Sequence, residues 1–398
     1  MRLGIFTDSY RPYFSGVIRS LELLRSELHR MGHKSYVFAP DYRDTSPEPD
    51  VFRFRSVRAI TFPSYNIAIP ISPFLGRRVK NLNLDIIHAH SPFLLGPAGA
   101  RWAKRLDLPL VFTHHTLYDQ YLHYAPMGEL MWKGILDKVV KDFCHRSDVV
   151  IAPSSGLAKL LRRRGIDSRI EVIPTGISLE QFAPPEEMRI GREQLGIPQA
   201  APLVITVGRL GAEKNPHLLL ESFLRLTRRH PEAHLLVVGD GPLKGELKQW
   251  VQAHGLGDQV VFTGSVPPDQ VTQLYYLSDL FVLASQSETQ GLVVVEAKAC
   301  GLPVVSLRNL SSDDLLYTSP HPREDGIILD EACPEALALA VSGLLENEAR
   351  CNKMSANAKR NAPQFSSTAW ARRMEDLYLE LIDSRRRSRS TVRASSGD

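Results

Sequence analysis

The feature that most constrains the fold is an alternation of short β-rich runs with longer segments of helical periodicity, which occurs twice along the chain. Helical patterns lie, for example, at residues 17–31 and 130–145. Such alternation is typical of a parallel, doubly wound sheet, because a parallel neighbour is reached only through a crossover, which is usually a helix. The predicted strands of the first series are residues 2–7, 34–39, 86–89, 110–113, 149–152 and 170–173.

A second series begins after residues 174–202, a segment rich in proline, glycine and acidic residues that we interpret as a linker around a short helix. At 398 residues the chain exceeds one ordinary core and suits two domains of about 180 residues. The sequence therefore predicts an α/β protein of two Rossmann-like domains, with ligands bound at the carboxyl ends of the strands, in the cleft between the domains. The predicted strands of the second series are residues 203–207, 234–238, 259–263, 280–283, 303–306 and 326–329.

We place the domain boundaries near the linker and before the last helical pattern. The predicted N-terminal domain is residues 1–180, and the predicted C-terminal domain is residues 181–365. Residues 366–384 are predicted to form a helix that packs as a clasp, and residues 385–398, rich in Ser and Arg without periodicity, a disordered basic tail. The apolar residues at helical spacing in the clasp are Trp370, Met374, Leu377, Tyr378 and Leu381.

Composition favours a soluble globular protein. Hydrophobic residues make up 43% and charged residues 23%, which excludes wholesale disorder. No apolar run approaches the ~20 residues needed to span a bilayer, and the first residues contain no signal-peptide core, so we expect a cytoplasmic protein. The four cysteines lie far apart without a neighbouring histidine cluster, which predicts neither disulfides nor a zinc site.

Positive charge is concentrated in the first half of the chain. Residues 1–180 hold 25 Lys and Arg against 17 Asp and Glu, whereas residues 181–398 hold 23 against 27. Within residues 51–106 nine cations accompany one acid, Asp85, and aromatic and aliphatic residues lie between them. This mixture suits an anionic membrane surface, where each cation near the headgroups contributes about 1 kcal/mol. A solvated basic face over an ordinary core is the alternative, and no nucleic-acid-binding motif accompanies the charge.

The residues behind this membrane prediction are of two kinds. The cations are Arg53, Arg55, Arg58, Arg77, Arg78, Lys80, Arg101, Lys104 and Arg105. The interleaved apolar residues are Phe52, Phe54, Phe62, Tyr65, Ile67, Ile69, Phe74, Leu75 and Trp102.

The most informative local segment is residues 287–303, which reads SETQGLVVVEAKACGLP. Gly291 suits a tight turn, and residues 292–300 are predicted to continue as a buried helix. The N–H groups and partial positive charge at a helix start attract a phosphate or a polarised sugar hydroxyl. Glu288 before the turn and Glu296 about two helical turns later can accept hydroxyl groups of one bound sugar, although the same spacing also occurs in ordinary α/β packing.

Two further segments of the second series follow predicted strands. Gly208 and Arg209 are followed by Lys214, and a pairing of Arg with Lys suits a diphosphate. Gly239 and Asp240 start a glycine-containing turn that lets a ligand or neighbouring backbone approach closely. Exposed loop cations and an ordinary strand-to-helix turn are the alternatives.

The first domain contributes a histidine, an aromatic segment and a long loop. His115 lies just past a predicted strand, at the end where ligands bind, although a histidine there can also be structural. The loop of residues 8–17 ends with Gly16 at a helix start, where backbone N–H groups can meet a phosphate. Candidate walls of an acceptor pocket, or simply packing residues, are Tyr118, Tyr121, His123 and Tyr124.

Together these segments resemble the retaining glycosyltransferases of family 4, which have the GT-B fold. The resemblance covers residues 1–383 and depends on residues 288–296, Gly208-Arg209 with Lys214, residues 239–241 and His115. Within the family, three runs resemble the bacterial 1,2-diacylglycerol 3-glucosyltransferases: His115-Thr116-Leu117-Tyr118, Tyr121-Leu122-His123-Tyr124 and Glu288-Thr289-Gln290-Gly291. Many members have Phe-Gly in place of Gln290-Gly291, and a first glycine in place of Ser15.

The resemblance implies roles for particular residues. Arg209 and Lys214 would hold the nucleotide diphosphate, and Glu296 the ribose hydroxyls. Glu288 and the backbone from Thr289 to Leu292 would hold the donor sugar, with His115 close to the reacting carbon. The implied catalytic residues are thus His115, Glu288, Arg209 and Lys214. The remaining implied donor-binding residues are Gly16, Gly208, Gly239, Asp240, Thr289, Gln290, Gly291 and Leu292.

The resemblance also implies the reaction. A hexose, with UDP-glucose as the first expectation, would pass to a lipid such as diacylglycerol with retention of configuration, on the cytoplasmic face of an anionic membrane. No cofactor or metal is expected, and the chain contains no Asp-x-Asp pair for a metal-bridged donor. The open alternatives are a GDP-mannose-dependent mannosyltransferase acting on a phosphatidylinositol-type lipid, transfer to a soluble sugar, a nucleotide-sugar epimerase and a non-catalytic nucleotide-sugar sensor.

Overall fold

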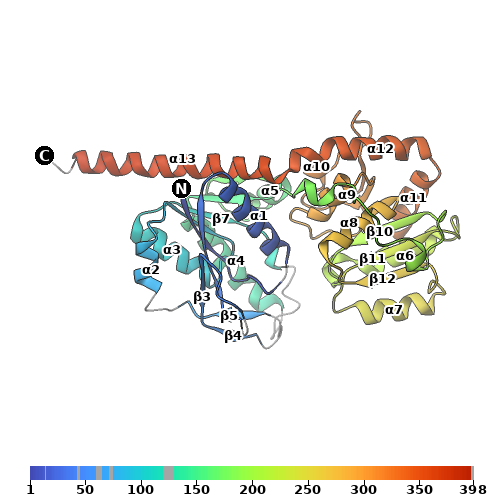
Figure 1. Cartoon of the computed structure of the whole chain (residues 1–398), viewed down its shortest axis with the longest axis horizontal. Coiled ribbons are helices and arrows are strands. Elements are labelled where there is room, and N and C mark those ends of the chain that lie inside the picture. The colour runs from blue at the N-terminus through green and yellow to red at the C-terminus, as the bar shows by residue number, and fades with distance from the viewer. Residues whose placement is uncertain (14, 43–44, 60–64, 71–74, 120–128, 396–398) are drawn as a thin grey trace. The chain divides into compact units, whose positions relative to one another are not determined.

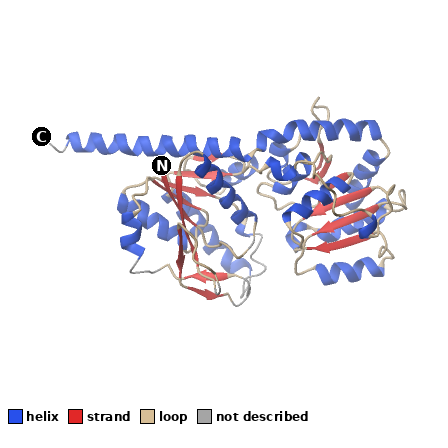
Figure 2. Cartoon of the chain, in the orientation of Figure 1, coloured by secondary structure: helices blue, strands red, loops and turns tan. Residues whose placement is uncertain are grey.

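The computed structural model describes residues 1–13, 15–42, 45–59, 65–70, 75–119 and 129–395. The chain forms two compact units (Figure 1). The N-terminal unit comprises residues 1–176 together with 367–398, and the C-terminal unit comprises residues 177–366. In both units a sheet is flanked by helices, as Figure 2 shows, so each unit has the Rossmann-like arrangement that the alternation predicts.

The N-terminal unit is built on a seven-stranded parallel sheet in the order β3-β2-β1-β6-β7-β8-β9. Its strands are β1 (Arg2–Phe6), β2 (Lys34–Pro40), β3 (Val51–Phe54), β6 (Ile86–Ala89), β7 (Leu110–Thr113), β8 (Val149–Ala152) and β9 (Ile170–Val172). Its first helices are α1 (Gly16–Arg30), α2 (Leu75–Asn81), α3 (Leu95–Leu106), α4 (Glu129–Arg146) and α5 (Ser155–Arg163). Every strand predicted in the first series is present within one residue at each end.

Three short strands were not predicted. They are β3 and the antiparallel hairpin of β4 (Ser56–Arg58) and β5 (Asn66–Ala68). Most residues of these strands are not fully buried, and Arg53, Arg58 and Asn66 are among them, so the strands lack the mainly apolar runs that predicted the others.

The segment of residues 51–106 divides between core and surface. Phe54 is buried, and Phe52 stacks on Phe38 with ring centroids 5.1 Å apart, so these two aromatic residues belong to the interior and not to a lipid-facing surface. Arg53 is also not available to a membrane surface, because its guanidinium pairs with Glu48 at 2.8 Å. The predicted residues Phe62 and Phe74, and the side chains of Leu75 and Arg77, lie outside the described part of the structure. The exposed cations of the segment are Arg55, Arg58, Arg78, Lys80, Arg101, Lys104 and Arg105.

The last helix, α13 (Ser367–Ser395), returns to the N-terminal unit and packs beside α1. Trp370, Met374, Leu377 and Tyr378 are buried there, as the predicted clasp requires, with apolar residues of α1 and of the sheet. The prediction of a disordered tail from residue 385 is wrong as far as Ser395, because α13 continues to that residue.

Acidic residues of the N-terminal unit explain the ordered end of α13. Arg385 pairs with Asp148 at 2.6 Å and with Asp107 at 3.1 Å. Arg389 also pairs with Asp107, at 2.5 Å. The arginines therefore have protein partners that lie far away in the sequence, and their composition alone does not reveal this.

The C-terminal unit is built on a six-stranded parallel sheet in the order β12-β11-β10-β13-β14-β15. Its strands are β10 (Leu203–Val207), β11 (His234–Val238), β12 (Val260–Gly264), β13 (Leu280–Leu283), β14 (Val304–Leu307) and β15 (Gly326–Leu329). Its α-helices are α6 (Pro216–Leu226), α7 (Lys244–Ala253), α8 (Pro268–Leu277), α9 (Leu292–Ala299), α10 (Ser312–Leu315), α11 (Pro334–Leu345) and α12 (Glu348–Asn361). Short 3-10 turns are η2 (Leu179–Phe182), η3 (Glu193–Leu195), η4 (Ala212–Lys214) and η5 (Ala362–Phe365).

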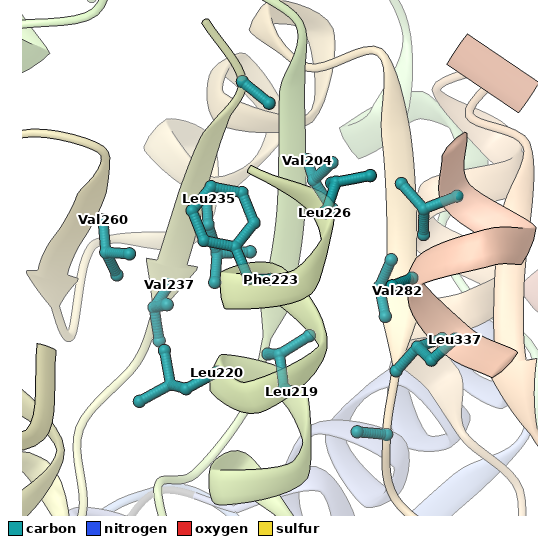
Figure 3. Close-up of a cluster of buried hydrophobic side chains, with 14 of the residues drawn as sticks. Val204, Leu219, Leu220, Phe223, Leu226, Leu235, Val237, Val260, Val282 and Leu337 are labelled. Carbon is teal, nitrogen blue, oxygen red and sulfur yellow. The ribbon is translucent and has the colours of Figure 1, made fainter. Parts of the chain in front are cut away.

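Both faces of this second sheet are apolar, which explains the continuous hydrophobic runs of its strands. Alternate residues of β10 join different cores: Val204 packs with α6 and α11, whereas Ile205 packs with α8 and α9. Figure 3 shows the first of these cores, in which Leu219 and Phe223 of α6 cover the strands. Two buried faces hold the strands in place, so their carboxyl ends form a fixed edge from which the loops leave.

Candidate active site

The loops after β10 and β11 pack directly against each other in the C-terminal unit. The Gly208 N–H donates to the carbonyl of Val238 at 2.9 Å, and the Leu210 N–H donates to the carbonyl of Asp240 at 3.0 Å. Gly239 has a φ of 135°, and a Cβ there would lie 1.9 Å from the carbonyl oxygen of Gly208. The glycine predicted to permit close approach therefore makes room for the neighbouring loop.

Asp240 completes this turn at the surface. Its carboxylate accepts the Gly241 N–H at 2.8 Å and pairs with Lys244 at 2.6 Å. The Lys244 ammonium lowers the pKa of Asp240, so the side chain is a carboxylate at neutral pH. The side chain is exposed, and its contacts hold the start of α7 in position.

Two residues predicted from separate segments meet in the structure. Lys214, at the end of η4, places its Nζ 2.5 Å from Oε1 of Glu288, which precedes α9. The Ser287 hydroxyl donates to the carbonyl of Glu213 at 2.9 Å and adds a second link between the same loops. The loops after β10 and β13 thus present a cation and a carboxylate together at one edge of the sheet.

Glu213 is a buried acidic residue next to Arg209 that sequence reasoning missed. Its side chain is 1% exposed, and Oε1 lies 4.0 Å from Nη1 of Arg209, whose side chain is 36% exposed. Neither carboxylate oxygen of Glu213 has a hydrogen-bond partner among the described residues. The sequence carried no clear signal for this contact, because Arg209 lies in the loop after β10 and Glu213 in the 3-10 turn that follows.

The start of α9 has the geometry predicted for residues 287–303. Gly291 has a φ of 68°, a left-handed conformation that favours glycine, and Leu292 is the first helical residue. The N-cap residue is Gly291 itself, which has no side chain to cap this first turn. Thr289 is partly buried and Gln290 is buried beside it. The helix start therefore offers backbone N–H groups and a partial positive charge at the edge where Lys214 and Glu288 lie.

Glu296 is more deeply buried than Glu288. Its side chain is 4% exposed, and its Oε2 accepts the hydroxyl of Tyr275 at 3.2 Å. Tyr275 comes from α8 and is fully buried. Sequence reasoning did not identify this tyrosine, because it lies 21 residues away in an ordinary helical pattern.

A buried ion pair fixes the far side of α9. Lys298 and Asp325 are both fully buried, with Nζ 2.8 Å from Oδ2. Asp325 also accepts the Asn361 amide at 2.7 Å and the Tyr317 N–H at 2.9 Å. Burial lowers the pKa of Lys298, although the Asp325 carboxylate opposes that shift. The pair anchors the helix whose start belongs to the candidate site.

In the N-terminal unit, His115 follows β7 and contacts a second histidine. Its Nε2 lies 2.8 Å from Nδ1 of His90, and the two rings stack with centroids 5.1 Å apart. Burial lowers the pKa of His115 to about 3 and that of His90 well below its usual range, so both imidazoles are neutral at pH 7. The structure therefore pairs the predicted catalytic histidine with one that sequence reasoning did not select.

His88 continues this cluster into the core. Its ring centroid lies 4.0 Å from that of His90. Its Nε2 contacts the Thr113 hydroxyl at 2.7 Å, and its Nδ1 contacts the Tyr378 hydroxyl of α13, also at 2.7 Å. The available signal was the spacing of His88 and His90, because residues two positions apart on a strand point to the same face.

Asp8, which follows β1, accepts hydrogen bonds from backbone N–H groups at the start of α3. Its carboxylate accepts the N–H groups of Leu94 at 3.1 Å and Leu95 at 2.7 Å, and it also accepts the Ser91 hydroxyl. Burial raises the pKa of this carboxyl group, and the hydrogen bonds oppose the shift. Asp8 therefore shapes the loop that carries His90 and Ser91.

The remaining predicted residues of this unit have varied surroundings. Gly16 is the exposed first residue of α1, and a Cβ there would meet no atom within 4 Å. Ser15, the departure from the family pattern, caps α1 by accepting the Ile18 N–H at 3.4 Å. Tyr118 packs edge-on against Phe93 with centroids 4.9 Å apart. The predicted acceptor residues Tyr121, His123 and Tyr124 lie outside the described residues.

Comparisons with known proteins give two family matches and several relatives. The Glycosyltransferase Family 4 model matches residues 14–181, and the Glycosyl transferases group 1 model matches residues 188–361. The alpha-monoglucosyldiacylglycerol synthase of Streptococcus pneumoniae is 34% identical over 406 residues, covering 96% of this chain and 86% of that protein. The enzyme of the same name from Acholeplasma laidlawii is 28% identical, covering 96% and 98%. A GDP-mannose-dependent alpha-mannosyltransferase of Corynebacterium glutamicum is 29% identical, covering 96% and 89%.

Solved structures share the fold of both units. Sucrose-phosphate synthase from Thermosynechococcus elongatus has a TM-score of 0.75 at 22% identity, covering 96% of this chain and 99% of that chain. Anabaena HepE in complex with UDP-glucose has a TM-score of 0.74 at 20% identity, covering 96% and 100%. At these identities the likeness establishes the fold.

Proposed function

The chain belongs to the glycosyltransferases of family 4 and has their GT-B fold, and from this premise we propose that it transfers glucose from UDP-glucose to a diacylglycerol. The observation that carries the proposal is the match, over 96% of this chain, to two enzymes whose names specify alpha-monoglucosyldiacylglycerol. The reaction proposed here retains the anomeric configuration and uses no metal ion.

The residues of the C-terminal unit support a site for the nucleotide sugar. Arg209 and Lys214 follow β10, and the start of α9 lies at the same edge of the sheet. Two cations and a helix N-terminus can stabilise the charge that develops on a leaving diphosphate. The Lys214 to Glu288 ion pair sets the position of both side chains, and a sugar hydroxyl can take over part of the hydrogen bonding of Glu288.

In the proposed chemistry the bond from the anomeric carbon to the diphosphate oxygen breaks while the acceptor hydroxyl forms a new bond on the same face. The hydroxyl proton passes to the departing phosphate oxygen, so no enzyme nucleophile is required. Asp8 is a poor candidate for such a nucleophile because its oxygens accept hydrogen bonds from the start of α3. His115 is proposed to donate a hydrogen bond to the donor sugar near its reacting carbon.

An anionic membrane is the proposed source of the acceptor. Val57 and Ile67 of the β4–β5 hairpin and Ile69 just after it are 53%, 39% and 42% exposed, and Arg55 and Arg58 are exposed beside them. Exposed apolar groups with flanking cations suit insertion at a headgroup layer. None of the helices in the described part of the chain is long and apolar enough to cross a bilayer.

A cavity near this surface adds cations that can meet lipid phosphate. It has a volume of about 550 Å³ and is lined by residues of α3 together with Phe54 and Pro70. Three of its lining side chains are the exposed cations Arg101, Lys104 and Arg105. Each cation held near anionic headgroups contributes about 1 kcal/mol.

The test of the membrane proposal is co-sedimentation with phosphatidylglycerol vesicles. We expect binding that weakens with salt, because added ions screen the attraction, and that falls on combined Arg101→Ser, Lys104→Ser and Arg105→Ser. The matched control removes three exposed cations of the C-terminal unit by Arg228→Ser, Arg229→Ser and Lys248→Ser. Equal binding to neutral vesicles, or an equal loss in both triple variants, would contradict the proposal.

The test of the reaction is incubation with UDP-glucose, UDP-galactose or GDP-mannose, each combined with diacylglycerol, phosphatidylinositol or a soluble sugar, followed by mass and NMR analysis of products. We expect an α-glucosyl diacylglycerol from UDP-glucose. The match to a GDP-mannose-dependent enzyme over 96% of the chain makes mannosyl transfer the second candidate, and a mannosylated lipid would establish it. Epimerised nucleotide sugar without acceptor, or donor binding without turnover, would overturn both.

A further inference from the structure

The contact between His90 and His115 restricts where each ring carries its proton. The two atoms in contact are Nδ1 of His90 and Nε2 of His115, 2.8 Å apart. Both rings are buried or partly buried, and burial lowers the pKa of both, so they are neutral at pH 7. A neutral imidazole has one N–H and one bare nitrogen, so one of the two rings must donate and the other must accept.

Two arrangements satisfy this hydrogen bond. In the first, Nδ1–H of His90 donates to Nε2 of His115, and His115 then carries its proton on Nδ1. In the second, Nε2–H of His115 donates to Nδ1 of His90, and His90 then carries its proton on Nε2. The arrangements differ in what they leave at Nε2 of His90, a lone pair in the first and an N–H in the second.

The surroundings of Nε2 of His90 favour the first arrangement. This atom is buried and has no hydrogen-bond partner among the described residues. Buried N–H groups without an acceptor are rarer in proteins than buried acceptors without a donor. The second arrangement would bury an unpaired N–H, whereas the first leaves only a lone pair.

The ring of His90 is held in the orientation that this bond needs. It lies between His88, with centroids 4.0 Å apart, and His115, with centroids 5.1 Å apart. His88 is fixed in turn by the hydroxyls of Thr113 and Tyr378. A hydroxyl can donate or accept, so these contacts fix the ring of His88 without dictating its tautomer.

We infer that His90 is a positioning residue that holds His115 in the Nδ1-protonated tautomer. Nδ1 of His115 is then its hydrogen-bond donor, suited to an oxygen acceptor such as a sugar hydroxyl. The link to sugar binding rests on the proposed function, whereas the tautomer itself does not.

The direct test is NMR of protein labelled with ¹⁵N-histidine at pH 7.5, where the nitrogen shifts report which ring atom carries the proton. Loss of signals in His115→Gln assigns the resonances. We expect His115 to be protonated on Nδ1 in the unmodified protein. Protonation on Nε2 overturns the inference whatever reaction the protein catalyses.

Two nearly isosteric variants sharpen the test. In His90→Asn the amide nitrogen can lie near the position of Nδ1 and donate, so His115 should keep its tautomer and kcat should change by less than about threefold. In His90→Asp the carboxylate only accepts, so the proton of His115 should move to Nε2. Loss of one hydrogen bond to the reacting sugar should then lower kcat by about tenfold or more, with a smaller effect on KM.

UDP binding to the C-terminal unit, measured by calorimetry, and the melting temperature serve as controls for folding. Identical tautomers of His115 in the Asn and Asp variants would overturn the inference. So would equal loss of kcat in both variants with folding intact, because a merely structural role does not distinguish a donor from an acceptor. If the tautomer of His115 shifts in His90→Asp but glucosyl transfer is unchanged, the inference about the tautomer stands and the proposed role of His115 in sugar transfer fails.

Discussion

The two units have the same kind of parallel sheet, but they hold buried polar groups at its carboxyl edge by different means. In the N-terminal unit His88, His90 and His115 are neutral rings that pair with one another and with hydroxyls. In the C-terminal unit the corresponding edge holds a charged pair, Lys214 with Glu288. A second charged pair, Lys298 with Asp325, is fully buried at the other end of α9, just before β15.

This difference shows how one architecture provides two electrostatic environments. A neutral imidazole avoids most of the cost of burying a charge, and it can still donate a hydrogen bond. A buried ion needs a counter-ion and further hydrogen bonds, but it creates a strong local field. Under the proposed function the neutral edge suits an uncharged sugar, and the charged edge suits a departing diphosphate.

The largest expected effect is the loss of stability when the buried ion pair of the C-terminal unit is broken. Lys298→Met leaves Asp325 buried without its counter-ion and should lower the free energy of unfolding by about 3–5 kcal/mol. Urea titration followed by hydrogen exchange and mass spectrometry measures the loss separately in each unit. Glu335→Ala, which breaks the exposed pair with Arg225, is the control and should cost less than about 1 kcal/mol.

The double variant Lys298→Met with Asp325→Leu sharpens this test. Removing both charges should recover part of the stability, because no uncompensated charge remains. A cost below about 1 kcal/mol for Lys298→Met alone would show that the C-terminal unit does not depend on this charged pair, and the contrast between the units would fail.

The next effect is on turnover. Lys214→Ala and Glu288→Ala should each lower kcat by at least about 100-fold, or roughly 2.7 kcal/mol, because each removes a preorganised contact to developing charge or to the donor sugar. The measurement is the initial rate with UDP-glucose and diacylglycerol, and Glu335→Ala should stay close to the unmodified rate. Near-normal rates in both site variants, with folding intact, would remove the assigned donor site.

An effect that is smaller for each residue distinguishes the stability of the two units by pH. Burial lowers the pKa of His88 and His115 to about 3 and that of His114 to about 4, so these rings stay neutral in the folded state while the unfolded chain binds protons below about pH 6.5. Stability is therefore complete above pH 6.5 and decreases as the pH falls toward 4. The loss at pH 5 should be about 1–2 kcal/mol per histidine.

The measurement is hydrogen exchange at pH 7 and pH 5, corrected for intrinsic exchange rates. Peptides of β6 and β7 in the N-terminal unit should lose protection at pH 5, and peptides of β10 and β13 should lose less. Equal losses in both units would show that the histidine cluster does not set the acid sensitivity of the N-terminal unit.

The smallest expected effect is that of chelation. EDTA should leave the rate unchanged, because Arg209, Lys214 and the start of α9 are proposed to stabilise the leaving diphosphate in place of a metal ion. Complete loss of activity, restored by magnesium or manganese, would mean that the charged edge of the C-terminal unit needs a further cation.

Much of the fold was predictable because its causes are local. Each long strand is an apolar run bounded by turn residues, and both faces of the second sheet are buried, so runs such as 203–207 and 280–283 stood out. The left-handed turn at Gly291 and the helix after it were predictable for the same reason, since glycine conformation and helical periodicity are properties of neighbouring residues.

Long-range contacts were decided only by the tertiary structure. His88 meets Tyr378 from a position 290 residues away, and Arg385 meets Asp148 across 237 residues. The first contact orders the cluster beneath His115, and the second extends a helix where composition predicted disorder. Such contacts depend on which side chains the packed sheet and α13 bring together, and no period of the sequence encodes that.

The sequence by itself therefore determined the two-sheet architecture and which loops carry Arg209, Lys214, Glu288 and His115. The tertiary structure decided which of these side chains pair and which become buried. It joined Lys214 to Glu288, placed Glu296 against Tyr275 and set His90 beside His115. The physical reason is that secondary structure follows from the conformational preferences of short segments, whereas charge pairing, burial and pKa depend on groups that only folding brings together.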